Sequence, residues 1–329
     1  MPRPWLSVIM PTYNGDRYLS LALESVLVQH DSDVEIIAVD DGSEDRTLDI
    51  LRSYAARMPL QVLQHKHSGN WVATSNHGLA VAQAEHACIL HQDDLWLLGR
   101  LAALRRLVEA RSDMALILHA TRFIGPQGEK LGTWRCPLPA SENGLDPEFV
   151  VERLMVANFV AMPAPLFRRD LALQAGGMDE SLWFLADWDL WLKLAAAGKS
   201  LYLPRTLAAF RIHGKSQTVQ RTSHLRDLDQ QYASLHKRHL EPWLRCSPER
   251  ANVGRVAQAA WDLARNLTAH FHHQPTEWSR WLLGCTWLGF AGWHRLLRDS
   301  RIMERVAARL RLARSGQFKN QESGISQGS

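Results

Sequence analysis

The sequence predicts an α/β fold: a mixed, mostly parallel sheet flanked by helices, with a helical C-terminal appendage. Three observations support this prediction. From Leu6 to about Phe123, short apolar runs alternate with segments of helical periodicity, a pattern typical of strand-helix units wound into one sheet. Polar clusters follow three of these apolar runs, where the strands would end. From residue 222 onward, the periodicity is helical.

The expected strands are short runs rich in apolar residues. They cover residues 6–10, 35–39, 61–63, 87–90 and 115–123. Helices are expected where apolar residues recur every three or four positions, at residues 18–28, from Asp45 onward, at 72–82 and at 99–110. In open sheets of this type, ligands bind beyond the carboxyl ends of the strands. We therefore look for the functional site among the polar clusters.

The second part of the chain is expected to be mixed and then helical. Residues 133–147 are rich in Pro, Gly and small polar residues, which indicates a loop leading to a second half that ends near Ile212. Helical periodicity follows at 222–240 and 253–267. The expected organisation is a domain over 1–215, divided into 1–124 and 125–215, a helical region over 216–314, and a disordered tail over 315–329.

Composition limits the classes of function. At 329 residues and 46% hydrophobic residues, the chain can bury a large core. The first apolar run is too short for a signal peptide or a membrane span, so we expect the chain to stay in the cytosol. Four widely spaced cysteines are expected to be reduced thiols. The sequence lacks the aromatic-and-basic stripe typical of single-stranded nucleic-acid binding, so we expect no nucleic-acid partner.

The three polar clusters contain two pairs of adjacent acids. The clusters are Pro11-Thr12-Tyr13-Asn14, Asp40-Asp41-Gly42-Ser43 and His91-Gln92-Asp93-Asp94. Adjacent carboxylates repel each other unless a cation neutralises them, and Asp93 and Asp94 could hold Mg²⁺ or Mn²⁺ against diphosphate oxygens. Two alternatives remain open: Asp93 and Asp94 could cap the following helix, and the segment from Asp40 to Ser43 could be only a turn with a cap.

Together, the three clusters resemble the nucleotide-binding half of the family 2 glycosyltransferases. The resemblance covers roughly residues 5–215 and depends on the runs Ser7 to Asn14, Val39 to Ser43 with Asp45 and Thr47, and Gln92 to Asp94. It implies a GT-A-type fold built of Rossmann-like halves. Residues 1–124 would then form the nucleotide-binding half of the catalytic domain, and residues 125–215 the acceptor half.

The resemblance also implies roles for residues in the first half. Pro11 and Tyr13 would flank the nucleobase, Asp41 would accept its ring N–H, Asp93 would lie near the ribose, and Asp94 would bind the metal ion. Tyr13 offers a flat apolar face to a heteroaromatic ring, and a carboxylate distinguishes a protonated ring nitrogen from an unprotonated one. These preferences favour uracil or thymine over cytosine, and therefore a UDP- or dTDP-sugar.

The second half carries a candidate general base. The run Leu185-Ala186-Asp187-Trp188-Asp189-Leu190-Trp191-Leu192-Lys193 resembles the acceptor-side segment of the family, in which Asp187 would take the proton of the acceptor hydroxyl. Asp187 could instead be a first-turn helix acid, and Asp189 is a competing candidate for the base. Trp188 and Trp191 could pack against sugar rings, or Trp191 could belong to the core.

Residues 210–216 resemble the Arg-x-His segment that closes the catalytic region of the family. By this resemblance, His213 would approach the metal ion or the diphosphate, although a single histidine can also be structural. Two positions depart from the family pattern. Ser75 stands where members often carry Arg, and Ala186 stands where they often carry Glu.

The resemblance implies a metal-dependent, inverting glycosyltransferase. It would transfer a sugar from a nucleotide-diphosphate donor to a glycan or a lipid-linked acceptor, in bacterial cell-surface glycan or lipid-linked oligosaccharide synthesis. Ser75 and Ala186 keep open a non-catalytic nucleotide-sugar sensor or scaffold. A nucleotidyltransferase would need a Gly-rich, Arg-Lys phosphate loop, which residues 11–16 do not provide.

Residues 278–314 form a separate feature of the sequence. An apolar stretch with several tryptophans precedes a segment, 295–314, with seven arginines and two acids. The continuous apolar length is too short to span a membrane. Two readings remain: a helix pair lying at the inner face of the membrane, drawn by its aromatic residues and arginines, or an appendage that packs on protein with its arginines solvated.

Overall fold

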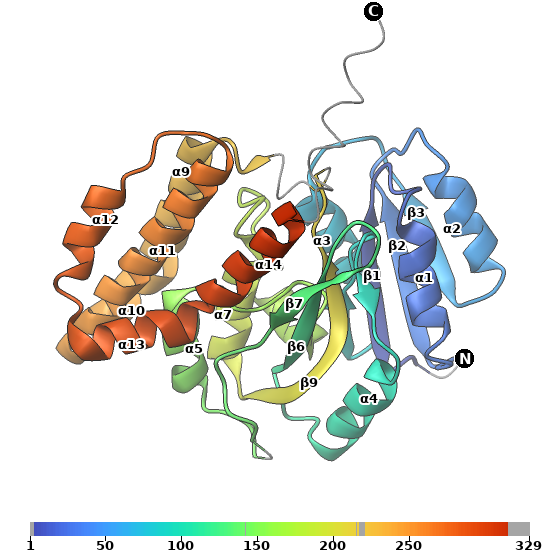
Figure 1. Cartoon of the computed structure of the whole chain (residues 1–329). Coiled ribbons are helices and arrows are strands. Elements are labelled where there is room, and N and C mark those ends of the chain that lie inside the picture. Colours follow the sequence, from blue (N-terminus) through green and yellow to red (C-terminus); the bar gives the residue numbers. More distant parts are fainter. Residues whose placement is uncertain (1–2, 142, 215, 217–220, 315–329) are drawn as a thin grey trace, which may run out of the picture. The chain divides into compact units, whose positions relative to one another are not determined.

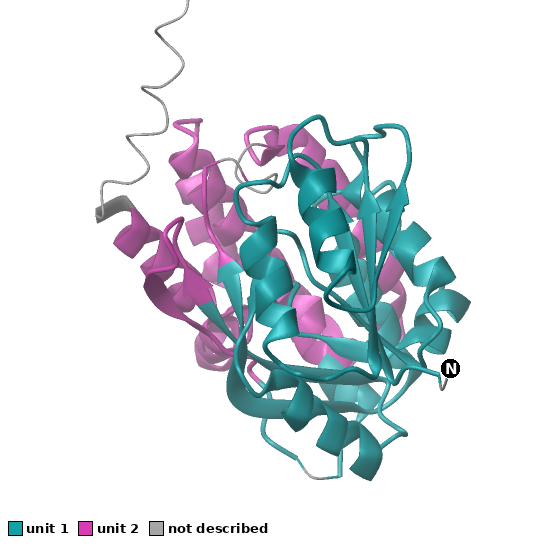
Figure 2. Ribbon diagram, turned by 90° about the vertical axis from the view of Figure 1, so that its right-hand side faces the viewer, with its two compact units in different colours: residues 1–122, 138–150, 160–210 teal, residues 123–137, 151–159, 211–329 magenta. Residues whose placement is uncertain are grey.

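The computed structural model describes residues 3–141, 143–214, 216 and 221–314. The chain divides into two compact units, which Figure 2 shows in separate colours. Unit 1 comprises residues 1–122, 138–150 and 160–210, and unit 2 comprises residues 123–137, 151–159 and 211–329. Residue 215 and the tail from 315, where we expected a boundary and disorder, lie outside the described residues. The other expected domain boundaries stay predictions.

Unit 1 is built on the mixed sheet that the sequence predicts (Figure 1). The strand order is β3-β2-β1-β4-β8-β6-β9-β5. Strands β1, β2, β3 and β4 pair in parallel, whereas β8 pairs antiparallel with β4 and β6, and β5 pairs antiparallel with β9. The strands are β1 (Leu6–Thr12), β2 (Val34–Asp40), β3 (Leu60–Gln64), β4 (His86–Ile89), β5 (Leu95–Trp96), β6 (Leu116–Ile124), β8 (Leu166–Arg168) and β9 (Ser200–Arg211).

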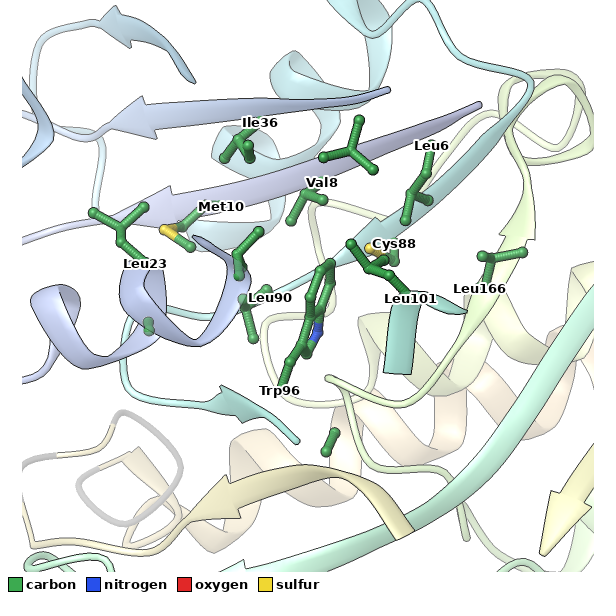
Figure 3. Close-up of a cluster of buried hydrophobic side chains, with 14 of the residues drawn as sticks. Leu6, Val8, Met10, Leu23, Ile36, Cys88, Leu90, Trp96, Leu101 and Leu166 are labelled. Carbon is green, nitrogen blue, oxygen red and sulfur yellow. The ribbon is translucent and has the colours of Figure 1, made fainter. Parts of the chain in front are cut away.

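Helices lie between the strands of unit 1 along the chain, and the first three of them connect its parallel strands. They are α1 (Leu19–Leu27), α2 (Thr47–Ala55), α3 (Trp71–Val81), α4 (Arg100–Ala110), α6 (Arg169–Gln174) and α7 (Ala186–Ala197); α5 (Pro147–Val156) is divided between the units. Figure 3 shows the core between β1, α1 and α4, to which Leu6, Val8 and Met10 contribute from every second position of the strand. Each such side chain contributes roughly 1.5–3 kcal/mol through burial.

The parallel strands position the site. β1, β2 and β4 run in the same direction and end at Thr12, Asp40 and Ile89. Because the carboxyl ends of parallel neighbours lie at one edge of a sheet, the three polar clusters emerge next to one another. The predicted fold class and the position of the clusters are therefore confirmed.

Unit 2 is mostly helical, as expected. It contains β7 (Lys130–Trp134), α9 (Leu225–Leu235), a π-helical turn (His236–Leu240), α10 (Glu241–Arg245), α11 (Ala251–Phe271), α12 (Trp278–Cys285), α13 (Gly289–Ser300) and α14 (Ile302–Arg314). Among the described helices, none has both the length and the apolar character needed to cross a membrane.

Several arginines of residues 295–314 make contacts inside unit 2 and are not simply solvated. Arg311 of α14 donates a hydrogen bond to the carbonyl oxygen of Leu131 in β7, and the guanidinium of Arg305 lies 5.6 Å from the ring centroid of Trp134. Arg298 pairs with the buried Asp299 at 2.6 Å. The alternative in which the arginines of this segment are merely solvated is therefore wrong for these side chains.

Candidate functional site

The loops after β1 and β2 are joined by hydrogen bonds. The backbone N–H of Asn14 donates to Ser43 Oγ at 2.9 Å, and Asn14 Oδ1 accepts the N–H of Glu44 at 2.9 Å. Asn14 has a φ of +44°, a left-handed conformation that asparagine tolerates better than most residues. The N–H of Gly15 donates to Thr47 Oγ1 at 2.7 Å. The first two polar clusters are therefore one connected structure.

Asp40 and Asp41 have different tasks. Asp40 accepts hydrogen bonds from the backbone N–H of Ser43 at 2.9 Å and from the hydroxyl of Thr12 at 3.2 Å. Asp40 therefore stabilises a turn, in agreement with the alternative in which the segment from Asp40 to Ser43 is a turn. Asp41 is also buried, with 4% exposure, but its carboxylate is directed to the loop that follows β3.

The loop after β3 surrounds the carboxylate of Asp41 with donors. Oδ1 accepts the N–H and the hydroxyl of Ser68 at 2.8 and 2.9 Å, and Oδ2 accepts the N–H of Gly69 at 2.9 Å. Nδ1 of His65 and Nδ1 of His67 lie 3.2 and 3.0 Å from the same carboxylate. Burial alone would raise the pKa of Asp41, but the hydrogen bonds from Ser68 and Gly69 and the charge of His67 outweigh it and lower that pKa.

His67 also contacts the tyrosine that was expected to hold a nucleobase. Its ring is stacked on Tyr13, with centroids 4.2 Å apart and planes 15° apart. Nδ1 of His67 also lies 2.9 Å from the carbonyl oxygen of Asp41. Because both neighbours of Nδ1 are acceptors, Nδ1 carries the proton. A flat ring with an N–H thus lies between Tyr13 and Asp41.

The third cluster holds the first in place. Gln92 makes two hydrogen bonds with the backbone of Tyr13, accepting its N–H and donating to its carbonyl oxygen, each at 2.9 Å. Gly15 permits this contact, since a Cβ at this position would lie 2.3 Å from Gln92 Oε1. The loop after β1 and the loop after β4 are therefore in direct contact.

The same loop presents a group of potential metal ligands. One ligand atom each from His91, Asp93 and Asp94 lie within 4.8 Å of one another. The backbone N–H of Asp94 donates to the carbonyl oxygen of His91 at 3.1 Å, which closes a tight turn. The following helix starts at Arg100 with Gly99 at its N-cap, so the alternative in which the two acids cap that helix is wrong.

The chemistry of this group fits a divalent cation. Two carboxylates and an imidazole provide hard and borderline donors at one point. Burial lowers the pKa of His91, and the charge of Asp93 opposes that shift only in part. The imidazole is therefore neutral near pH 7, which is the form that binds metal ions.

The start of α3 connects this edge of the sheet to the segment that precedes α7. The side-chain amide of Asn70 donates to the carbonyl oxygen of Glu180 at 3.1 Å, and Trp71 Nε1 donates to the carbonyl oxygen of Trp183 at 2.8 Å. The ring of Trp71 also packs edge-on against His91, with centroids 5.0 Å apart. Trp71 therefore joins the potential metal ligands to the segment that leads into α7.

A second link lies one helical turn further along α3. Asn76 donates to the carbonyl oxygen of Met178 at 2.8 Å and accepts the N–H of Met178 at 3.0 Å. Gly177, with a φ of +69°, allows this approach. Ser75, which departs from the family pattern, is buried and donates to the carbonyl oxygen of Trp71 within the helix.

Helix α7 separates the two candidate bases. Asp189 has no exposed surface and pairs with Lys193 at 2.6 Å. Asp187 lies in the first turn and is partly exposed, with Oδ1 accepting the N–H of Trp188 at 2.7 Å. Trp188 is 5% exposed and Trp191 is fully buried, which supports the core reading for Trp191. Of the two acids, only Asp187 is accessible to an acceptor.

The remaining candidates are Pro11, Asp93 and His213. Pro11 is buried near the end of β1, and Asp93 is partly exposed next to Asp94. His213 is 7% exposed and belongs to unit 2, so its role as a metal ligand stays a prediction. Unit 1 thus brings together Tyr13, Asp41 and the 91–94 cluster and ties them to the segment before Asp187.

Sequence reasoning missed several residues of this site. The segment His67-Ser68-Gly69-Asn70-Trp71 was not identified, and His91 and Gln92 were given no role. One signal was present: small polar residues and a glycine between a strand and an Asn-capped helix are typical of a loop whose backbone N–H groups face a ligand.

Comparisons with known proteins identify sequences similar to this chain. Residues 7–169 match the profile of the family described as Glycosyl transferase family 2. An uncharacterized glycosyltransferase of Nostoc sp. is 28% identical over 313 residues, covering 88% of this chain and 91% of that protein. An uncharacterized glycosyltransferase of Rickettsia typhi is 25% identical over 238 residues, covering 71% and 72%.

Two solved structures share the fold. TarS of S. aureus in complex with UDP-GlcNAc has a TM-score of 0.58 and 17% identity, covering 95% of this chain and 92% of that chain. The mannosyltransferase PcManGT of Pyrobaculum calidifontis, in complex with GDP-Man and Mn²⁺, has a TM-score of 0.53 and 17% identity, covering 94% and 87%. These likenesses confirm the predicted GT-A-type fold class.

Proposed function

We propose that this chain, which belongs to glycosyltransferase family 2, transfers a sugar from a nucleotide-diphosphate donor to an acceptor hydroxyl and inverts the anomeric centre. The observation that carries the proposal is the link through Trp71, whose indole contacts both His91 and the carbonyl oxygen of Trp183. One residue thus joins a potential cation site to the segment leading to Asp187. The solved neighbours bind UDP-GlcNAc and GDP-Man, which supports a nucleotide-sugar donor.

The nucleobase would lie between Tyr13 and Asp41, beside Pro11. The ring of His67 already stacks on Tyr13 and has its N–H 3.0 Å from Asp41 Oδ2, the two contacts that a uracil or thymine ring would make. We propose that the base displaces this imidazole, whose side chain is 46% exposed. Cytosine has no proton on the corresponding ring nitrogen, so the carboxylate of Asp41 would lack a hydrogen-bond donor. This disfavours cytosine.

The diphosphate would lie beside the 91–94 cluster. Asp93 is proposed to approach the ribose and Asp94 to hold a divalent cation, with His213 as the further ligand expected from the sequence. A bound Mg²⁺ or Mn²⁺ would neutralise diphosphate charge and stabilise the leaving nucleotide. The protein's own contribution is to place both carboxylates in one tight turn next to the nucleobase site.

Asp187 is proposed as the general base. Inversion requires a carboxylate that takes the acceptor's proton on the face of the sugar opposite the leaving diphosphate. Asp189 is unsuited to this task, because it is fully buried and its charge is held by Lys193 at 2.6 Å. Trp188 remains a candidate for contact with the acceptor sugar.

The test is transfer by purified full-length chain to a glycan acceptor mixture, with UDP- and dTDP-sugars and Mn²⁺. Asp187→Asn should lower kcat by about 10²–10⁴-fold while leaving UDP affinity unchanged, and Asp94→Ala should weaken UDP binding in the presence of Mn²⁺. Asp179→Asn is the matched control, since that side chain accepts hydrogen bonds from Ser181 in a turn. Full activity of Asp187→Asn would refute the assignment, and donor binding without any turnover in the wild type would favour the sensor reading.

We also propose that the acceptor is presented at a lipid surface. The end of α12, the following turn and α13 expose large apolar side chains, including Leu283 at 69%, Trp287 at 78% and Phe290 at 90%. Exposed Trp, Phe and Leu on short amphipathic helices are typical of interfacial segments. The exposed Arg280, at 74%, would face anionic headgroups. The position at the inner face of a membrane stays a prediction.

Vesicle co-sedimentation tests the lipid proposal. The full chain should bind vesicles of phosphatidylglycerol and phosphatidylethanolamine, and the double variant Trp287→Ser/Phe290→Ser should lose this binding and keep transfer to a soluble acceptor. Leu98→Ser is the control, since Leu98 is 78% exposed in unit 1. Absence of vesicle binding by the wild type, or dimerisation abolished by the double variant, would overturn the proposal in favour of a protein partner.

A further inference from the structure

The imidazole of His91 is a group that the proposed function leaves unused. Its Nε2 atom is shielded from solvent and makes no hydrogen bond with any described residue. A buried polar atom without a partner costs about 1–3 kcal/mol, so such an atom calls for an explanation. One of the ring nitrogens lies within 4.8 Å of both a carboxylate oxygen of Asp93 and one of Asp94.

The orientation of this imidazole is fixed by its neighbours. The ring of Trp71 packs edge-on against it at a 75° angle, and the carbonyl oxygen of His91 accepts the N–H of Asp94 at 3.1 Å. The hydrogen bond from Trp71 Nε1 to Trp183 in turn holds the indole. The imidazole is therefore held beside the carboxylates, and the cost of ordering a ligand is reduced.

The types of ligand atom determine which cation this site suits. Mg²⁺ prefers oxygen ligands in near-ideal octahedral geometry and keeps several waters, whereas imidazole nitrogen suits transition metals. We propose that His91 is a direct nitrogen ligand of the cation held by Asp94, and that it makes this site prefer Mn²⁺ over Mg²⁺. This inference rests on the proposed function, which places a cation at the donor site. It adds the identity of one protein ligand and of the preferred ion.

Electron paramagnetic resonance tests the ligand directly. Untagged full-length chain would be loaded with substoichiometric Mn²⁺ and excess UDP, and electron spin-echo modulation would be recorded. We expect ¹⁴N modulation that persists in His213→Ala and is lost when His91→Ala or His91→Asp is added to that background. His213→Ala is the matched control, because His213 is the other imidazole expected near the cation, and it should keep the modulation.

Competition between ions tests the preference. In Mn²⁺ titrations, His91→Ala should weaken binding by about 10-fold or more. His91→Asp replaces nitrogen by oxygen, so it should bind Mg²⁺ at least as well as the wild type and reduce the ratio of Mn²⁺ to Mg²⁺ affinity. A ¹⁴N signal that survives in His91→Ala and vanishes in His213→Ala would overturn the proposal, as would an unchanged affinity ratio in His91→Asp.

These readouts separate the inference from the proposed function. If Mn²⁺ binds with ¹⁴N modulation from His91 while no sugar is transferred, the ligand assignment stands and the transferase proposal fails. If transfer proceeds and Mn²⁺ shows no nitrogen ligand, the transferase proposal stands and the assignment of His91 fails.

Discussion

Gly177→Ala tests the link between α3 and the segment that precedes α7. Gly177 has a φ of +69°, and a Cβ at this position would lie 2.7 Å from Oδ1 of Asn76. That oxygen accepts the N–H of Met178 at 3.0 Å, and the amide of Asn76 donates to the carbonyl oxygen of Met178 at 2.8 Å. The methyl group therefore strains the backbone and also forces the paired hydrogen bonds apart.

The expected magnitude follows from these two effects. An alanine in the left-handed region costs roughly 1–2 kcal/mol, and the two hydrogen bonds contribute about 1 kcal/mol each. Gly177→Ala should therefore destabilise the chain by about 3–4 kcal/mol. Gly176→Ala is the matched control, because Gly176 has a φ of +79° but nothing lies within 4 Å of its Cβ position. Gly176→Ala should therefore be destabilised only by the backbone strain.

Urea unfolding followed by tryptophan fluorescence measures the difference. The free energy of unfolding of Gly177→Ala should be about 2 kcal/mol lower than that of Gly176→Ala. Donor affinity should also fall further in Gly177→Ala than in the control. Asn76→Ala in the Gly177→Ala background should add little, since the bonds it removes are already broken. Equal destabilisation by the two glycine substitutions would refute the reasoning.

Three further predictions concern single side chains. Asp189→Asn breaks the buried pair with Lys193 and should lower stability by about 3 kcal/mol, seen as a lower urea midpoint; an unchanged midpoint would count against a structural role. Because the pKa of Asp41 is lowered in the folded chain, its stabilisation is present above about pH 4 and is lost as pH falls through the folded value. The stability gap between wild type and Asp41→Asn should therefore close below about pH 4, and a constant gap would contradict this. His67→Ala removes the ring that competes with the base and should tighten UDP binding in calorimetry by about 1 kcal/mol, or roughly 5-fold; weaker binding would mean that His67 helps to hold the base.

The sheet and its polar edge were predictable because their signals are local. The segment Leu6–Thr12 is apolar up to Thr12 except for Ser7, and the next strand ends in two acids, so both the strands and their ends can be read from neighbouring residues. The distinction between Asp40 and Asp41 could not be read in this way. It depends on Ser68 and Gly69, which lie far along the chain and meet Asp41 only in the folded sheet.

Other features depend on contacts between distant segments. Arg311 bonds to the carbonyl oxygen of Leu131, 180 positions earlier, and no local pattern separates such an arginine from a solvated one. Trp191 lies one helical turn from Asp187 and could have faced an acceptor, yet it is fully buried. Asp189 resembles Asp187 in sequence and differs from it only through burial and its partner Lys193.

Hydrogen–deuterium exchange tests the central claim most directly, namely that a nucleotide diphosphate and a divalent cation bind at the carboxyl edge of the unit 1 sheet. With UDP and Mn²⁺, exchange should slow in peptides covering residues 11–16, 41–44, 65–71 and 91–95, and should not change in residues 225–271. UDP binding, measured by equilibrium dialysis, with slowed exchange confined to residues 225–271 would contradict the account.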